Sequence, residues 1–283
     1  MRNISYKFHR NVKINAGKYE LNLGTRTYIM GILNVTPDSF SDGGDFTSVN
    51  IAVNHAKDMI LEGADIIDIG GESTRPGSTE VGAEEELERV LPVVERLVKE
   101  IDVPISVDTY KAAVAEAVLK AGAHIINDIW GLQRDPDIAA VVARYDVPVI
   151  MMHNQNGTDY DKDIMEEISD FFRKSIEIAL NAGIKKENLI LDPGIGFGKT
   201  PDQNILVMSK LGELNDLGYP ILLGTSRKSM LGKILDLPPK ERVEGTVATT
   251  VMGIMQGMDI VRVHDIKENL RAARVTDAIV RCL

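Results

Sequence analysis

Acidic, amide and basic residues stand at the ends of short apolar runs in this chain. Asp108, Asn127 and Asp192 each end such a run, and Lys228 follows another. If the runs are parallel strands, their carboxyl ends meet on one face, so these side chains share one pocket. Two carboxylates in apolar surroundings need donors, and Lys228 supplies part of this for one of them. A flat heterocycle with a guanidine-like N–H edge would supply the rest; a buried Asp–Lys pair that only stabilises the fold is the alternative.

Two further groups extend this pocket. Apolar side chains suited to cover the faces of a flat ring are expected at Ile129, Ile150 and Met152. A second subsite is expected to bind an anion, because strands at the two ends of the chain contribute an amide, a guanidinium and an imidazole. These are Asn34, Arg262 and His264. They suit a phosphate or diphosphate, and Asn34 is also a possible oxygen ligand for Mg²⁺.

The segment 226–229, Ser-Arg-Lys-Ser, begins a predicted helix. Free N–H groups and a serine hydroxyl there can hold a carboxylate or phosphate, and Ser226 itself is expected to be an ordinary helix cap. The segments 34–44 and 70–77 are long for strand-to-helix connections and rich in Pro, Gly and Ser, which makes them candidate lids. Arg75 could close over a ring or an anion, or could remain a solvated loop charge.

The elements that must position these residues alternate regularly. Near-continuous apolar runs predict eight strands of a parallel sheet, buried on both faces, at 27–33, 65–70, 104–108, 124–128, 147–152, 189–192, 220–224 and 259–264. Helical periodicity predicts helices at 48–62, 84–100, 110–121, 137–145, 163–182, 201–217, 228–236, 240–256 and 266–281. Eight strand–helix units over about 250 residues indicate a (β/α)8 TIM barrel of the α/β class. A doubly wound open sheet, the alternative, usually has fewer strands and a cofactor fingerprint after the first.

One domain is expected to span residues 1–283, and residues 1–26 fall outside the repeat. Gly17 separates two runs of mixed polarity there, which predicts a β-hairpin closing the floor of the barrel. The sequence GIGFGKT resembles a phosphate-binding loop, but the pattern requires glycine where this chain has Pro193.

Composition excludes several other classes of protein. The 44% of hydrophobic residues and 26% of charged residues are typical of a globular protein. The net charge of −10 disfavours nucleic acid or an anionic membrane as the main partner. The single cysteine, Cys282, excludes intrachain disulfides and fits a reducing compartment. The N-terminus lacks the apolar core of a signal peptide and no 18-residue apolar run follows, so a cytoplasmic location is expected.

The motifs NVTPDSFSDGG, GGESTRPG, SVDT, IND, DPGIGFGKT, GTSRKS and RVHD, in this order over about residues 27–270, closely resemble those of the dihydropteroate synthases. The resemblance implies a (β/α)8 barrel, commonly a homodimer. It implies a transferase that joins 6-hydroxymethyl-7,8-dihydropterin diphosphate to 4-aminobenzoate, releases pyrophosphate and uses Mg²⁺. The stretch HNQNG at 153–157 departs from the family, in which glycine often follows the histidine sooner.

The resemblance also implies roles for individual residues. It places the pterin on Asp108, Asn127, Asp192 and Lys228. Ile129, Met152 and Gly196 are also expected in the substrate site. It places the diphosphate and metal on Asn34, Arg262 and His264, with Thr74 near the substrate. It assigns 4-aminobenzoate to Thr74, Arg75, Pro76, Phe197, Lys228 and Ser229, and puts Asp38 and Phe40 in the first mobile loop. Asp108, Asp192, Lys228, Arg262 and His264 are thereby the expected catalytic residues.

Two other functions remain open from the sequence. A methyltetrahydrofolate-dependent methyltransferase shares a pterin-binding barrel, but it would lack the Ser-Thr-Arg-Pro-Gly loop and would need a corrinoid partner. A barrel that binds pterin without turnover is the non-enzymatic alternative, which the presence of the anion-site and loop residues argues against. The late helices around 240–281 are the expected dimer surface.

Overall fold

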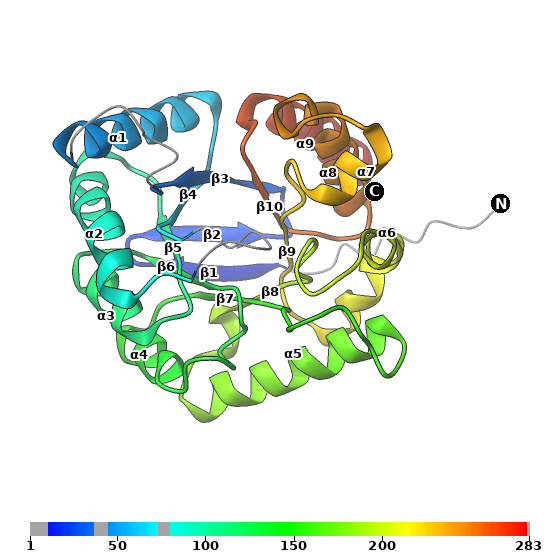
Figure 1. The fold of residues 1–283 in the computed structure, drawn as a ribbon, viewed down its shortest axis with the longest axis horizontal. Helices are drawn as coiled ribbons and strands as arrows, with labels where there is room; N and C mark the ends of the chain where they lie inside the picture. Colours follow the sequence, from blue (N-terminus) through cyan, green and yellow to red (C-terminus); the bar gives the residue numbers. More distant parts are fainter. Residues whose placement is uncertain (1–10, 37–44, 73–79, 282–283) are drawn as a thin grey trace.

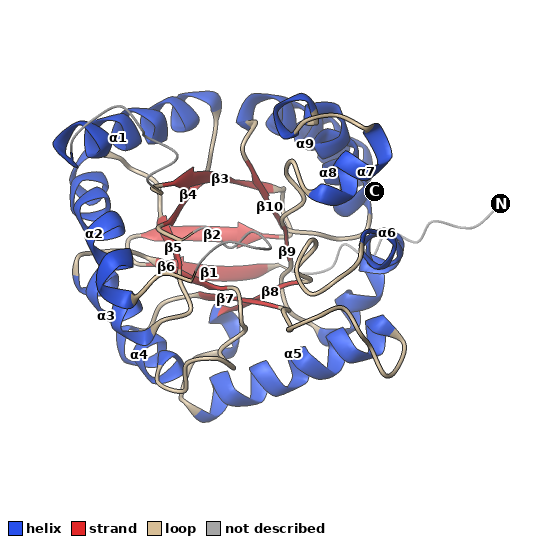
Figure 2. Ribbon diagram, in the orientation of Figure 1, coloured by secondary structure: helices blue, strands red, loops and turns tan. Residues whose placement is uncertain are grey.

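A computed structural model describes residues 11–36, 45–72 and 80–281. Helices form an outer ring around a central sheet of parallel strands (Figures 1 and 2). The strands of this sheet are β3 (Tyr28–Asn34), β4 (Ile66–Gly70), β5 (Ile105–Asp108), β6 (Ile125–Asp128), β7 (Val149–Met152), β8 (Leu189–Asp192), β9 (Leu222–Leu223) and β10 (Ile260–Val263). The α-helices are α1 (Asp45–Glu62), α2 (Ala83–Glu100), α3 (Ala112–Lys120), α4 (Ile138–Tyr145), α5 (Ile164–Asn181), α6 (Pro201–Lys210), α7 (Ser229–Leu235), α8 (Val243–Met255) and α9 (Ile266–Val280).

The sheet closes into a barrel. Its strand order is β8-β7-β6-β5-β4-β3-β10-β9, so the first and last strands of the repeat, β3 and β10, pair with each other. A bridge between Leu191 and Ile221 then joins β8 to the start of β9, where the Leu191 N–H donates to the Pro220 carbonyl at 2.9 Å. This arrangement confirms the predicted (β/α)8 barrel.

The N-terminal hairpin covers the amino ends of the barrel strands. Strands β1 (Val12–Ala16) and β2 (Tyr19–Leu23) pair antiparallel across a turn at Gly17, as predicted. Their buried side chains pack against residues at the starts of the barrel strands. The cluster consists of Ile14, Ala16, Leu21, Leu23, Tyr28, Met30, Ile66, Ile125, Ile150, Ile190, Leu222 and Ile260. One end of the barrel is thus sealed by apolar packing, which leaves the carboxyl ends as the face that can hold a site.

The predicted elements occur with small differences at their ends. Strand β9 is shorter than predicted because Pro220 cannot donate to the ladder, so only Leu222 and Leu223 form regular pairs. Helix α6 gives way to a 3-10 helix at Leu211–Leu217, where the Gly212 N–H donates to the Gln256 side chain instead of continuing the helical ladder. Helices α3 and α8 begin later than predicted, at Ala112 rather than residue 110 and at Val243 rather than residue 240.

Candidate active site

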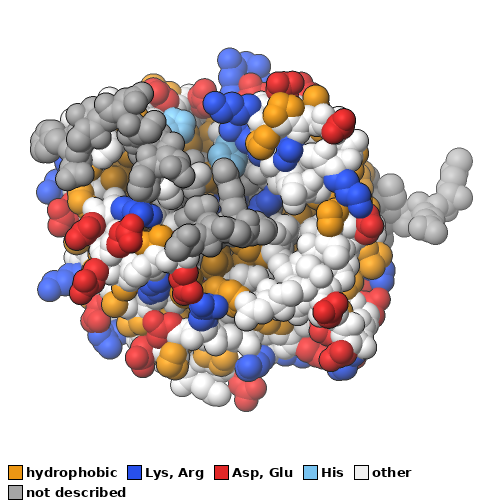
Figure 3. Space-filling view, in the orientation of Figure 1, with side chains coloured by type: hydrophobic (Ala, Val, Ile, Leu, Met, Phe, Trp, Pro, Cys, Tyr) orange, Lys and Arg blue, Asp and Glu red, His pale blue; other side chains and the backbone are white. Residues whose placement is uncertain are grey.

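The carboxyl ends of the strands carry the polar residues of interest. Asn34, Asp108, Asn127 and Asp192 lie at or one residue before the last position of β3, β5, β6 and β8, and Arg262 lies one residue before the end of β10. Figure 3 shows a hollow near the middle of one face of the molecule, with hydrophobic atoms on its floor and charged side chains spread around it. Among the described residues, no three His, Cys, Asp or Glu side chains are grouped to bind a metal.

Arg262 joins three strands of the barrel through ion pairs. Its Nε donates to Asp68 Oδ2 at 2.6 Å and its Nη2 to Asp108 Oδ2 at 2.9 Å. The same Asp68 oxygen accepts a hydrogen bond from Asn127 Nδ2 at 3.1 Å. The guanidinium therefore lies among the residues expected to bind the pterin, whereas the sequence placed it only with Asn34 and His264.

Asp192 and Lys228 lie on the same side of this cluster. A Cβ built on Gly224 would be 3.9 Å from both Arg262 Cβ and Asp192 Oδ2, so the Asp192 carboxylate lies beside the arginine. A Cβ at Gly196, where φ is +87°, would come within 2.9 Å of Lys228 Cδ, so glycine is needed there to admit the lysine. Asp108, Asp192, Lys228 and Arg262 thus gather at one rim.

Burial changes the acidity of the two rim carboxyls. Burial raises the pKa of Asp108, and the positive charge of Arg262 opposes part of this rise. It also raises the pKa of Asp192, while the Gly194 N–H and then the charge of Lys228 oppose it. The pKa of Arg262 rises although burial alone would lower it, because the charges of Asp68 and Asp108 outweigh that effect. The ionised forms of Asp108 and Asp192 therefore need further hydrogen-bond donors to stabilise them, and a bound ligand can supply these.

An apolar surface faces the polar rim. Tyr110, Ile129 and Met152 form a buried cluster with the partly buried Trp130 and Phe197. Lys228 Nζ lies 4.0 Å from the centre of the Phe197 ring. The expectation for Ile150 was wrong. Ile150 lies two residues nearer the amino end of β7 than Met152. It therefore packs with the hairpin residues, while Met152 lies at the mouth of the barrel.

His264 is held by a serine that the sequence assigned differently. Ser226 Oγ accepts from the His264 backbone N–H at 3.1 Å and lies 2.9 Å from His264 Nδ1. Ser226 does not cap the following helix, which begins at Ser229 with Lys228 at its N-cap and no side-chain cap. The predicted cap was wrong because the hydroxyl bonds across to the end of β10. Ser229 is exposed at the first position of that helix.

The connection between β8 and α6 contains a buried lysine that the sequence analysis passed over. Lys199 Nζ lies 3.0 Å from the carbonyl oxygens of Gly194 and Phe197 and 2.8 Å from His153 Nδ1. Burial lowers the pKa of Lys199 to about 7, and burial together with the charge of Lys199 lowers that of His153 to about 2. Three acceptors for one ammonium group fix the path of the backbone that carries Phe197.

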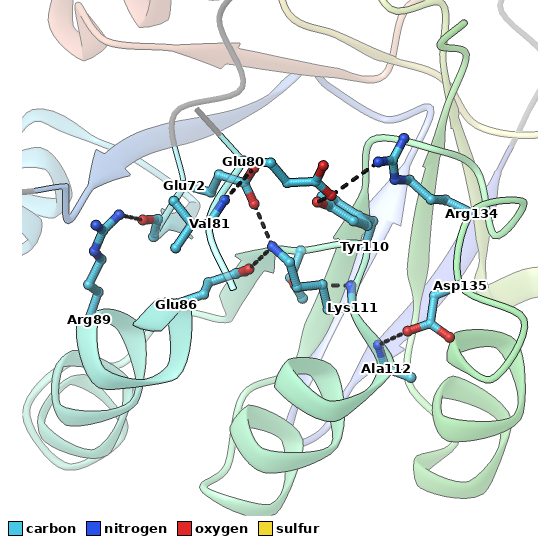
Figure 4. Close-up of polar contacts among 12 residues, drawn as sticks. Glu72, Glu80, Val81, Glu86, Arg89, Tyr110, Lys111, Ala112, Arg134 and Asp135 are labelled. Atoms are coloured by element: carbon cyan, nitrogen blue, oxygen red, sulfur yellow. Dashed lines mark hydrogen bonds and ion pairs between the residues drawn. The ribbon is translucent and has the colours of Figure 1, made fainter. Parts of the chain in front are cut away.

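A second ionic group lies beside the start of helix α2 (Figure 4). Lys111 bonds to both Glu72 and Glu86, and the Glu86 side chain is 1% exposed. Glu80 accepts from Tyr110 at 2.7 Å and from Arg134 at 3.0 Å. Glu72 follows β4 and Glu80 precedes α2, so these contacts hold both described ends of the connection between the two elements.

Several residues named from the sequence lie outside the described ranges: Asp38, Phe40, Thr74, Arg75 and Pro76. Among the described residues, Asp68 is the main omission from the sequence analysis. It stands in the run Ile-Ile-Asp-Ile-Gly, and a charge inside an apolar strand is itself a signal, because a buried charge must be paired. Lys199 and its partners gave no comparable signal, since the contacts depend on the path of a loop.

Comparison with known proteins agrees with this geometry. A family model described as pterin binding enzyme matches residues 30–264. A dihydropteroate synthase of Clostridium beijerinckii is 59% identical over 266 residues, which cover 94% of this chain and 98% of the relative. The corresponding protein of Bacillus subtilis is 56% identical, covering 90% and 89%.

Solved structures resemble the whole barrel. A Clostridium difficile dihydropteroate synthase in the presence of pteroic acid has a TM-score of 0.90 and 64% identity, covering 92% of this chain and 98% of the other. A Xanthomonas albilineans enzyme with 4-aminobenzoic acid has a TM-score of 0.91 and 43% identity, covering 95% and 98%. By sequence and structure, the chain belongs to the dihydropteroate synthase family of pterin-binding enzymes.

Proposed function

We propose that this protein is a dihydropteroate synthase, which condenses 6-hydroxymethyl-7,8-dihydropterin diphosphate with 4-aminobenzoate and releases pyrophosphate. The observation that carries the proposal is the gathering of Asp108, Asp192, Lys228 and Arg262 at one rim beside an apolar wall. A fused heterocycle with several N–H donors and an anionic tail is the ligand class that satisfies these groups together.

The pterin ring occupies the deeper part of the site. Its N–H edge donates to Asp192 and Asp108, while Asn127 and Lys228 complete the contacts. Ile129 and Met152 cover a face of the ring. The carboxylates are ionised when the ring binds, because two parallel N–H donors stabilise the charged form of an aspartate.

The diphosphate lies toward Arg262 and His264. The amide oxygen of Asn34 is a suitable ligand for Mg²⁺, and it lies at the rim near Asp108. A Cβ built on Gly70 would be 3.8 Å from Asn34 Oδ1 and 3.9 Å from Asp108 Oδ2. Mg²⁺ is commonly held by one or two protein oxygens together with substrate phosphates, so Asn34 and the diphosphate would hold it. When bound, the metal would supply positive charge that stabilises the departing diphosphate.

The reaction proceeds as a dissociative substitution. The bond between the exocyclic carbon and the diphosphate oxygen breaks first, because an arylamine is a weak nucleophile. The electron pair leaves with the diphosphate, which Arg262 and His264 stabilise, and the electron-rich pterin spreads the positive charge that remains. Asp108 and Asp192 favour that cation electrostatically. The amine of 4-aminobenzoate then forms the carbon–nitrogen bond and loses a proton to solvent or pyrophosphate.

The second substrate lies above the reacting carbon. Phe197 and the stem of Lys228 pack against the aromatic ring. Ser229, exposed at the start of α7, donates to the carboxylate from its hydroxyl and its backbone N–H. Thr74, Arg75 and Pro76 complete this site. Excluding water here protects the cation from hydrolysis.

The working form is a cytoplasmic homodimer. Exposed apolar side chains on α8 and α9 support a dimer surface there, with Met252, Val275 and Ile279 50%, 62% and 64% exposed. The single cysteine, Cys282, supports a reducing compartment. In the part of the chain that the structure describes, no helix has the length and apolar character needed to cross a bilayer.

Pyrophosphate release tests the function. Release that needs both pterin diphosphate and 4-aminobenzoate, with formation of dihydropteroate, is the expected result. Release with the pterin substrate alone, at the same rate, would identify a hydrolase instead.

A further inference from the structure

Asp68 lies at the middle of β4, below the rim, with its side chain fully buried. One carboxylate oxygen, Oδ2, accepts from Arg262 Nε at 2.6 Å and from Asn127 Nδ2 at 3.1 Å. These partners come from β10 and β6. Asp68, Asn127, Asp192 and Arg262 thus stand on β4, β6, β8 and β10, alternate strands of the kind that fill one layer of a barrel.

From this geometry, and resting on the proposed function, we infer that Asp68 is a positioning residue that orients the diphosphate-binding arginine and the pterin-binding asparagine together. Asp68 holds Arg262 at Nε and Asp108 holds it at Nη2. Among the described residues, Nη1 of Arg262 has no partner. The edge of the guanidinium formed by Nε and Nη2 is therefore fixed, and Nη1 can donate to an anion.

The energetics favour a role in orientation over a role in stability. Asp68 Oδ1 is buried and has no hydrogen-bond partner among the described residues, as is also true of the neighbouring Ser106 Oγ and Asn127 Oδ1. A buried charge that is only partly satisfied is expensive, and buried ion pairs are often replaceable by apolar side chains without loss of stability. The barrel bears this cost at Asp68, where Arg262 and Asn127 bond to the same carboxylate oxygen.

Charge is the second contribution of Asp68. Two carboxylates, Asp68 and Asp108, face one guanidinium, so Arg262 is held in its charged form and cannot turn away toward solvent, with its side chain only 18% exposed. Once oriented, the arginine does not need to reorganise when the diphosphate binds or leaves.

The test compares Asp68→Asn with Asp65→Asn. Asp65 is a matched control because it precedes the same strand at the opposite end of the barrel and pairs with another arginine, Arg26, at 2.7 Å. For Asp68→Asn we expect kcat to fall and KM for pterin diphosphate to rise, each by about tenfold, the size of one charge-assisted hydrogen bond. KM for 4-aminobenzoate stays within about twofold, because Asp68 does not reach that site. Asp65→Asn lowers the melting temperature and leaves both kinetic constants unchanged.

A double-mutant cycle with Arg262→Lys separates positioning from a general effect. If Asp68 acts through Arg262, Asp68→Asn costs far less in the Arg262→Lys background than in the wild type. Equal costs in both backgrounds, or wild-type kinetics for Asp68→Asn, would overturn the inference. Should Asp68→Asn not fold, Asp68→Ser removes the charge without adding volume and is measured in the same way. Failure of both to fold would assign Asp68 a structural role and so also overturn it.

The wild-type assay keeps this inference distinct from the proposed function. If the wild-type protein forms no dihydropteroate, the proposed function fails. If the wild type turns over and Asp68→Asn equals it, the function stands and only the positioning role is lost.

Discussion

Arg262 shows how single side chains shape this site. It lies between the carboxylates of Asp68 and Asp108 on two neighbouring strands, and the carboxylate of Asp192 lies close by. A lone guanidinium at a barrel mouth would be mobile and hydrated, whereas this one is fixed before substrate arrives. Asp108, which holds the guanidinium at Nη2, is also expected to face the ring of the proposed substrate, so pterin and diphosphate recognition share a residue.

Asp192→Asn tests recognition of the pterin edge. The amide keeps the shape but replaces an acceptor by a donor, so the affinity for a pterin without phosphate should fall by at least about tenfold. Isothermal titration calorimetry measures the change. Asp259→Asn is the control, since Asp259 is equally buried but lies at the amino end of β10, where it accepts from the Ile221 N–H. Near-wild-type affinity for Asp192→Asn would contradict the proposed contact.

The acidity of the rim carboxyls predicts a pH dependence. Burial raises the pKa of Asp192, so the protonated form persists to a higher pH than in an ordinary aspartate and cannot accept two N–H donors. Pterin affinity should therefore increase as pH rises from 5 to 8. Titrations across this range measure it, and in Asp192→Asn the increase should be smaller. An affinity that falls over the same range would show that the carboxylate is not the binding form.

At the scale of elements, contacts of charged side chains hold the connections after the strands. The β8–α6 connection is tied by Lys199, and the two described ends of the β4–α2 connection are tied by Lys111 and Glu80. Polar contacts of this kind fix the backbone of the connections that they hold. They also make the loops sensitive to pH and to single substitutions.

Lys199 makes stability depend on pH in a defined direction. Its folded pKa of about 7 lies below the ordinary 10.5, so the unfolded chain binds more protons between these values. The free energy of unfolding gains a contribution that rises with pH from about 7 to 10. Chemical denaturation at a series of pH values measures this, and Lys199→Met should have a flatter profile over the range. A profile identical to the wild type would show that Lys199 titrates normally.

Lys111 compensates two carboxylates, one of them almost fully buried. Lys111→Met should lower the free energy of unfolding by about 3 kcal/mol, because Glu86 would be left as an uncompensated buried charge. Adding Glu86→Gln should restore part of the loss. Denaturant titration of the two variants checks both statements, and a double mutant less stable than Lys111→Met would contradict the pairing.

At the scale of the whole molecule, the hairpin seals one end of the barrel and leaves chemistry to the other. The apolar layer between β1, β2 and the strand starts excludes water from the floor. Substrates therefore approach only from the face where the strands end. Helices α8 and α9 belong to the outer ring of helices (Figure 1), and both carry exposed apolar side chains.

The outer face of α9 gives a prediction about assembly. Val275 and Ile279, one turn apart and mostly exposed, are expected to lie in the dimer interface. Replacing both by glutamate should convert the dimer to a monomer in analytical ultracentrifugation. The same double change at Ile205 and Leu206, two exposed apolar residues on α6, is the control and should leave the mass unchanged.

Much of this architecture could be predicted from the sequence because it depends on local patterns. Apolar runs and helical periodicity identified the repeat, and the polar residues at strand ends indicated the rim. Contacts across the barrel could not be predicted in this way. The pairing of Asp68 with Arg262 spans 194 positions of sequence, and Ser226 bonds to His264 rather than capping its own helix, because tertiary geometry decides which partner a short polar side chain meets.

The most direct test is a crystal structure of the protein with pterin diphosphate, Mg²⁺ and an unreactive analogue of 4-aminobenzoate. We expect the pterin edge to lie on Asp192 and Asp108, and the diphosphate to lie on Nη1 of Arg262 and on His264. A pterin bound away from these carboxylates, or a diphosphate out of reach of Arg262, would contradict it.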